Sequence, residues 1–67
     1  MNKETLDRLH TESEELFDKL TKLEAFVTTH PKFYRLDKTQ QGLLRTQLHA
    51  MLTYHNILNL RIETLTQ

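Results

Sequence analysis

The sequence predicts an all-α fold, an antiparallel two-helix hairpin with coiled-coil-like packing that assembles into a homo-oligomeric helical bundle. Two observations predict the hairpin. Each half of the chain carries apolar residues at alternating steps of three and four, which is the spacing of a helix seam. The chain's single proline, Pro31, lies between the halves and ends the first helix. A third observation, the width of the apolar surface on the second half, predicts the assembly.

The first helix is expected to run from about residue 3 to about residue 28, within a single domain that spans residues 1–67. Asn2 is the expected N-cap, and Glu4 and Asp7 in the first turns suit the positive end of the helix dipole. One polar residue, Ser13, interrupts the apolar seam. The seam consists of Leu6, Leu9, Ser13, Leu16, Leu20, Leu23 and Val27.

The connection over residues 29–36 contains two adjacent aromatic residues, Phe33 and Tyr34. Because apolar rings are costly to leave in water, we expect Phe33 to cover the open end of the helix pair, and a short helical turn fits this segment. Asp37 is the expected N-cap of the next helix, and Gln40 is placed to complete a capping box.

The second helix is expected from about residue 38 to about residue 65. Gly42 costs up to about 1 kcal/mol there relative to alanine, which indicates either the close approach of another backbone or simple tolerance. The seam has one polar member, His55, which we interpret as fixing the helix register, with contact to a ligand as the alternative. The seam consists of Leu44, Leu48, Met51, His55, Leu58, Ile62 and Leu65.

A second row of residues lies beside this seam and widens the apolar surface to roughly 220° of the helix circumference, about twice what one partner helix covers. The hairpin supplies one neighbour. A 67-residue chain without cysteine also buries a marginal core, and such domains commonly gain stability by oligomerisation. We therefore expect the protein to bind itself in a homo-oligomer. The second row consists of Gln40, Leu43, Gln47, Ala50, Tyr54, Ile57 and Arg61.

Charge and hydropathy argue against several classes of partner. The formal net charge is zero, which gives no basis for binding nucleic acid or an acidic membrane surface. No apolar run reaches the roughly 18 residues of a membrane span, and the first residues lack a signal-peptide pattern, so we expect a soluble cytoplasmic protein. Residues 1–30 carry seven acidic and four basic side chains, and residues 31–67 carry two acidic and five basic ones. The two helices should therefore attract each other, within the chain or between chains.

Catalytic patterns are not found in the sequence. It contains no glycine-rich phosphate loop, no nucleophile elbow and no cysteine, and its four histidines lack metal-ligand spacing. We therefore expect a protein that is not an enzyme and that uses no catalytic residue, metal or cofactor.

Two sets of residues are candidates for ligand binding. Gln47, Tyr54 and Arg61 recur every seven residues within the wide apolar surface, where a guanidinium suits phosphate and a phenol suits stacking. The alternative for this polar row is an ion-pair network between subunits, in which Arg61 meets acidic residues of a first helix, such as Glu12 or Asp7.

The second set, Lys32, Tyr34 and Arg35, forms a basic cluster with Lys38 at the hairpin tip, near a helix N-terminus that attracts phosphate. Asp37 caps the same terminus and repels anions, so a solvated turn is the alternative.

A distinctive set of apolar and polar positions runs through most of the chain: Lys22, Leu23, Glu24, Phe26, Phe33, Leu36, Leu43, Leu44, Gln47, Leu48, Met51, Tyr54, Ile57, Leu58, Arg61 and Ile62. This set resembles the crAss-phage-related family of small helical phage proteins of unknown function. The resemblance covers about residues 15–64, with Gln47, Tyr54 and Arg61 as the matching positions outside the core. His55 departs from the family pattern.

The resemblance implies a short phage accessory protein that acts in the host cytoplasm and forms homo-oligomers. Phage sponge proteins, which bind cyclic nucleotide immune signals without cleaving them, are similar in architecture. The leading hypothesis is therefore a counter-defence protein that sequesters a cyclic nucleotide at subunit interfaces. Arg61 would contact phosphate or ribose, Tyr54 would stack on a base, and Gln47 would form hydrogen bonds.

The alternative hypothesis is a helical protein-binding module that inhibits a host defence or regulatory protein by direct contact. The excess apolar surface, with Leu52, Leu60 and the flanking aromatic residues, would then dock on the host protein. A purely structural oligomer without a ligand is a third hypothesis.

Overall fold

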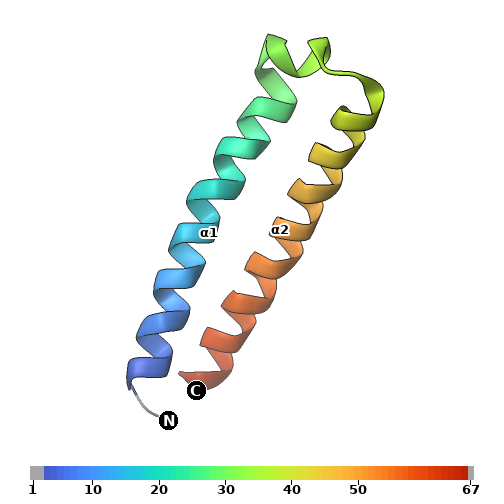
Figure 1. The fold of residues 1–67 in the computed structure, drawn as a ribbon. Coiled ribbons are helices and arrows are strands. Elements are labelled where there is room, and N and C mark those ends of the chain that lie inside the picture. The colour runs from blue at the N-terminus through green and yellow to red at the C-terminus, as the bar shows by residue number, and fades with distance from the viewer. Residues whose placement is uncertain (1–2, 67) are drawn as a thin grey trace.

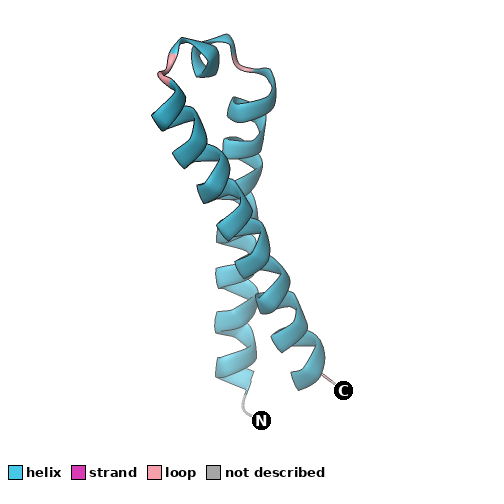
Figure 2. Cartoon of the chain, turned by 90° about the vertical axis from the view of Figure 1, so that its right-hand side faces the viewer, coloured by secondary structure: helices cyan, strands magenta, loops and turns pink. Residues whose placement is uncertain are grey.

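The computed structural model describes residues 3–66. Two long helices, α1 (Lys3–Thr29) and α2 (Lys38–Leu65), run antiparallel and are joined by the 3-10 helix η1 (Pro31–Arg35), as Figure 1 shows. Viewed from the side, α1 and α2 cross each other (Figure 2). The predicted all-α hairpin is confirmed. Asn2, the expected N-cap of α1, lies outside the described residues.

The two helices meet along the predicted seams, because the spacing of three and four places these residues on one side of each helix. The buried members are Leu9, Ser13, Leu20 and Val27 on α1 and Leu48 and Leu58 on α2. The remaining seam residues are half-buried at the margin of this line of contact. The core is thus a narrow strip between two helices in a rod measuring 48 × 15 × 14 Å.

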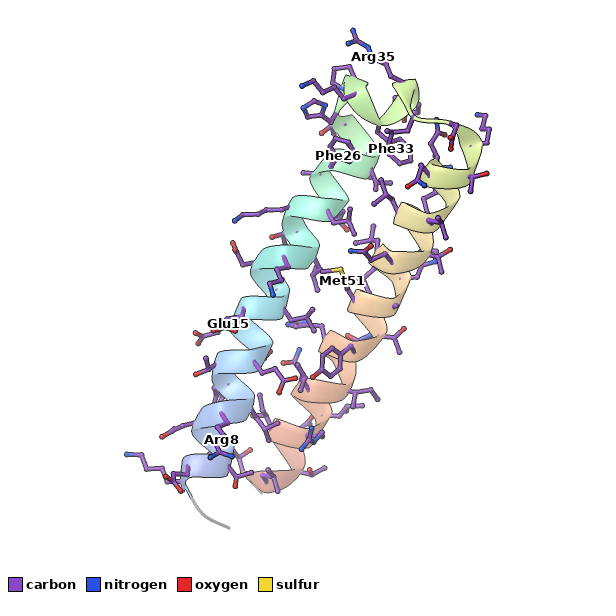
Figure 3. All side chains as sticks on the ribbon, in the orientation of Figure 1. Arg8, Glu15, Phe26, Phe33, Arg35 and Met51 are labelled. Carbon is purple, nitrogen blue, oxygen red and sulfur yellow. The ribbon has the colours of Figure 1, made fainter. Side chains whose placement is uncertain are left out.

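The tip of the hairpin is closed by Phe33, whose side chain is fully buried. The Phe26 ring meets it edge-on at 6.0 Å between ring centroids, and the guanidinium carbon of Arg45 lies 4.9 Å from the Phe33 ring centroid. Figure 3 shows Phe26 and Phe33 together beneath the tip. The expectation that Phe33 covers the end of the helix pair is therefore confirmed.

The start of α2 is fixed by two side chains. The Asp37 carboxylate accepts a hydrogen bond from the backbone N–H of Gln40 at 2.8 Å, which is the predicted N-cap. Gln41 is 4% exposed, and its Nε2 donates to the Leu36 carbonyl at 2.8 Å. Apart from the local backbone of α2 itself, nothing in the described chain lies within 4 Å of a Cβ added to Gly42, so the hairpin gives no close approach there.

Neither long helix has, among its described residues, a stretch long and apolar enough to cross a membrane.

Candidate functional site

The side of α2 that α1 leaves uncovered forms one continuous surface. At 100° per residue its members cover roughly 140° of the helix circumference. Between residues 43 and 60 all members of this surface are exposed, and none is Asp, Glu, Lys or Arg. We call this surface the uncharged face of α2, and it consists of Leu43, Thr46, Gln47, Ala50, Thr53, Tyr54, Ile57 and Leu60.

Four large side chains on the uncharged face remain in contact with water. Leu43 is 57% exposed, Leu60 54%, Ile57 47% and Tyr54 44%. Single exposed apolar residues are ordinary, whereas a continuous row of them on one helix marks a binding surface. The structure thus agrees with the expectation that α2 has more apolar surface than α1 can cover.

The polar row lies on this same side of α2. Gln47, Tyr54 and Arg61 are all exposed, and seven residues of helix separate successive members by about 10.5 Å. Arg61 follows the last apolar residue of the uncharged face, so the row ends in a positive charge. Among residues 3–66, the structure shows no ion pair to Arg61. Its guanidinium is therefore available to an anion that arrives from outside the hairpin.

The basic tip lies at one end of the rod. Lys32, Tyr34 and Arg35 are exposed on η1, and Arg35 projects away from the body of the hairpin in Figure 3. The segment is ordered by His30, whose Nδ1 accepts a hydrogen bond from the backbone N–H of Lys32 at 3.1 Å. Arg45 adds a further positive charge from α2, a contribution that sequence reasoning missed.

The six predicted site residues thus form two groups rather than one pocket. Three lie on η1 and three lie along α2. A shallow depression lies at the opposite end of the rod, lined by Glu4, Asp7, Arg8 and Thr11 of α1 (Figure 3 labels Arg8), and contains none of the six. A ligand held by either group therefore needs a second surface to enclose it.

A polar link joins the helices in the half of the rod away from the tip. The Ser13 hydroxyl donates to Asn59 Oδ1 at 3.0 Å, and Asn59 Nδ2 lies 3.5 Å from His55 Nδ1. The half-buried His55 ring also packs on Phe17 of α1, with 5.4 Å between ring centroids. The hydrogen bond that connects the two helices is thus made by Asn59, a residue that the sequence analysis did not single out.

In the described part of the chain, no three His, Asp or Glu side chains are grouped so that they could hold a metal ion.

Comparison with known proteins gives one match. A family model described as Sequestin matches residues 3–64, which is nearly the whole chain. The chain belongs to the Sequestin family. No curated protein and no solved structure matches it. The name Sequestin is consistent with a role in sequestration, and it suggests a binding protein rather than a catalyst.

Proposed function

We propose that this member of the Sequestin family is a non-enzymatic phage counter-defence protein. It sequesters a cyclic nucleotide immune signal at subunit interfaces in the host cytoplasm. The observation that carries the proposal is the polar row of α2, in which an amide and a phenol on the uncharged face are followed by the guanidinium of Arg61 just beyond it, all of them exposed. The family name and the resemblance to small phage proteins support the same function.

The chemistry of the row matches the parts of a cyclic nucleotide. Tyr54 offers a ring on which a base stacks, and such stacking contributes about 1–3 kcal/mol per base. Arg61 offers a forked cation for a phosphate, and a hydrogen bond to a charged group contributes about 1.5–3 kcal/mol. The Gln47 amide both donates and accepts hydrogen bonds, which suits a base edge or a ribose hydroxyl.

These magnitudes favour a site shared between subunits. Together with a neutral hydrogen bond from Gln47, one row supplies roughly 3–7.5 kcal/mol, whereas micromolar binding requires about 8.2 kcal/mol. A single exposed row therefore falls short even before the loss of ligand freedom is counted. Groups from a second copy of the chain would add to this binding energy and would also remove the ligand from water.

Calorimetry against a panel of cyclic dinucleotides, cyclic trinucleotides and cyclic ADP-ribose isomers tests the proposal. We expect one class to bind at micromolar concentration or tighter, and Arg61→Ala to weaken that binding at least about tenfold, because a charged hydrogen bond is lost. Arg35→Ala is the matched control on the basic tip. A reversed result, with Arg35→Ala harmful and Arg61→Ala neutral, would place the phosphate at Lys32, Tyr34 and Arg35. No binding across the panel would eliminate the cyclic nucleotide.

A second candidate function is the helical protein-binding module that inhibits a host protein. The exposure of Leu43, Ile57 and Leu60 on one helix favours it, because an amphipathic helix docks through such a row. Leu52, also expected in this contact, is half-buried and lies outside the uncharged face. One stoichiometric host partner recovered with the native chain, and lost with Leu60→Glu, would favour this function over nucleotide sequestration.

A further inference from the structure

The hairpin exposes more surface than a compact protein of its mass. Its accessible surface is 5186 Å², whereas a compact monomer of 8.0 kDa exposes about 4,450 Å². The excess, about 700 Å², is close to the roughly 800 Å² that one partner contributes to a standard protein interface. The radius of gyration is 15.0 Å, against about 11 Å for a compact domain of this length. It too shows that the single hairpin is more extended than a compact domain.

The uncharged face of α2 has the pattern of a second coiled-coil seam. Leu43, Gln47, Ala50, Tyr54 and Ile57 step by four and three, which is the spacing that receives another helix. Depletion of charged residues is also characteristic of the buried centre of an interface. The occupant that this surface fits is therefore a helix with a matching uncharged row, and α2 of a second copy has one.

The distribution of charge along the rod selects the orientation of that second copy. Residues 31–45, at the tip, carry Lys32, Arg35, Lys38 and Arg45 against Asp37 alone. The opposite end, formed by residues 3–14 of α1 and 59–66 of α2, carries more acidic than basic side chains: Glu4, Asp7, Glu12, Glu14 and Glu63 against Lys3, Arg8 and Arg61. A parallel pair would place two basic tips together, whereas an antiparallel pair places each tip beside an acidic end.

We propose that two copies of the chain form an antiparallel four-helix dimer through the uncharged face of α2. In the register that overlaps the two α2 helices over residues 39–65, Tyr54 lies opposite Ala50 of the partner subunit. A large ring then faces a small side chain, which is the complementarity that close packing requires. The same register sets Leu43 opposite Arg61 of the partner subunit, whose aliphatic stem can cover the leucine.

This arrangement also completes the ligand site. Arg61 of one copy falls at the level between Gln40 and Gln47 of the partner subunit, so amides from one chain and the guanidinium from the other converge at two equivalent places. This part of the inference rests on the proposed function, whereas the dimer itself does not. Each site is incomplete in a single hairpin, which agrees with the shortfall in binding energy of one row.

The mass of the protein in nucleotide-free buffer tests the dimer. Sedimentation equilibrium at micromolar concentration should give twice the 8.0 kDa of the chain. Ala50→Glu, which places a carboxylate at the centre of the interface, should raise the dimer dissociation constant at least about a hundredfold while the helical circular dichroism is kept. Ala25→Glu, at an exposed position of α1 outside the seam, is the matched control and should leave the dimer intact.

The distance between the two tips tests the orientation. The chain has no cysteine, so Tyr34→Cys introduces a single labelling site on η1 without changing the charge of the tip. Two spin labels should lie tens of ångströms apart, comparable with the 48 Å length of the rod. A monomeric protein, a dimer that tolerates Ala50→Glu, or a short distance between tips would each overturn the inference. Because no nucleotide is present, each of these failures is distinct from a failure to bind the ligand.

Discussion

Phe33 is the residue on which the connection between the helices depends. It is fully buried in an 8.0 kDa chain, while its neighbour Tyr34 is 62% exposed. Phe33→Ala should lower the free energy of unfolding by about 3–5 kcal/mol, because a large ring leaves a cavity at the tip. Domains of this size seldom have a free energy of unfolding above about 3–5 kcal/mol. The variant should therefore be largely unfolded even before urea is added, which circular dichroism along a urea titration would show.

Tyr34→Ala is the control for that change. The Tyr34 ring meets Phe33 edge-on at 5.4 Å between ring centroids, so its removal should lower the unfolding free energy by about 0.5–1.5 kcal/mol, well below the loss in Phe33→Ala. An unchanged urea midpoint in Phe33→Ala would show that the tip does not need its aromatic core.

Single residues also mark the limit of what the sequence reveals. The burial of Phe33 at the end of the helix pair was predicted, because an aromatic residue in a short loop is costly to leave in water. That argument needs only the sequence around Phe33. Asn59 and Arg45 were not predicted, because their partners lie on other elements. The fold of η1 brings Phe33 to Arg45, and the axial alignment of α1 on α2 brings Ser13 to Asn59. The spacing of one helix contains no information on that alignment. The six predicted ligand-binding residues are located on exposed surfaces, and their role stays a prediction.

At the scale of the element, α2 is a helix with two apolar sides and one neighbour. The seam residues on both helices were predicted from helical period alone, and their burial confirms them, because burial follows the face on which a residue lies. Five of the eight residues of the uncharged face, Leu43, Gln47, Ala50, Tyr54 and Ile57, belong to the second row predicted from the same period. Which molecule covers that face depends on surfaces outside the hairpin, so periodicity predicts the need for a partner and not its identity.

Gly42 offers a test of α2 as an isolated element. Apart from the local backbone of α2, nothing in the described chain lies within 4 Å of an added Cβ, and glycine is a poor helix former. Gly42→Ala should therefore raise the free energy of unfolding by about 0.5–1 kcal/mol in thermal or urea denaturation. Ala25→Gly, at an exposed position of α1, should lower it by a similar amount. A loss of stability in Gly42→Ala would instead indicate that another backbone approaches the glycine in the assembled protein.

At the scale of the whole molecule, the basic tip and the acidic end give the dimer a measurable dependence on salt. Screening shortens the reach of charge from about 30 Å at 0.01 M to about 3 Å at 1 M ionic strength. Raising the salt concentration over this range should weaken an antiparallel dimer several-fold in sedimentation equilibrium, because opposite charges lie side by side. A parallel dimer would respond with the opposite sign, because the repulsion between its two basic tips would be screened.

The variant with Arg35→Gln and Lys38→Gln provides the comparison for this measurement. It removes two of the positive charges at the tip, so its dimer should respond less to salt than that of the native chain.

The closed tip also sets an order for folding. Residues that meet across the hairpin near Phe33 are close in the sequence, and the sequence distance between partners grows steadily towards the termini of the rod. Short loops close at a smaller loss of chain entropy than long ones. Contacts between the helices should therefore form first near the tip, and they should open first at the end where the two termini lie. The helix ends far from the tip therefore have the largest freedom of motion. A second chain or a bound molecule that contacts both helices at that end would restrict this motion and hold the two helices together along their whole length.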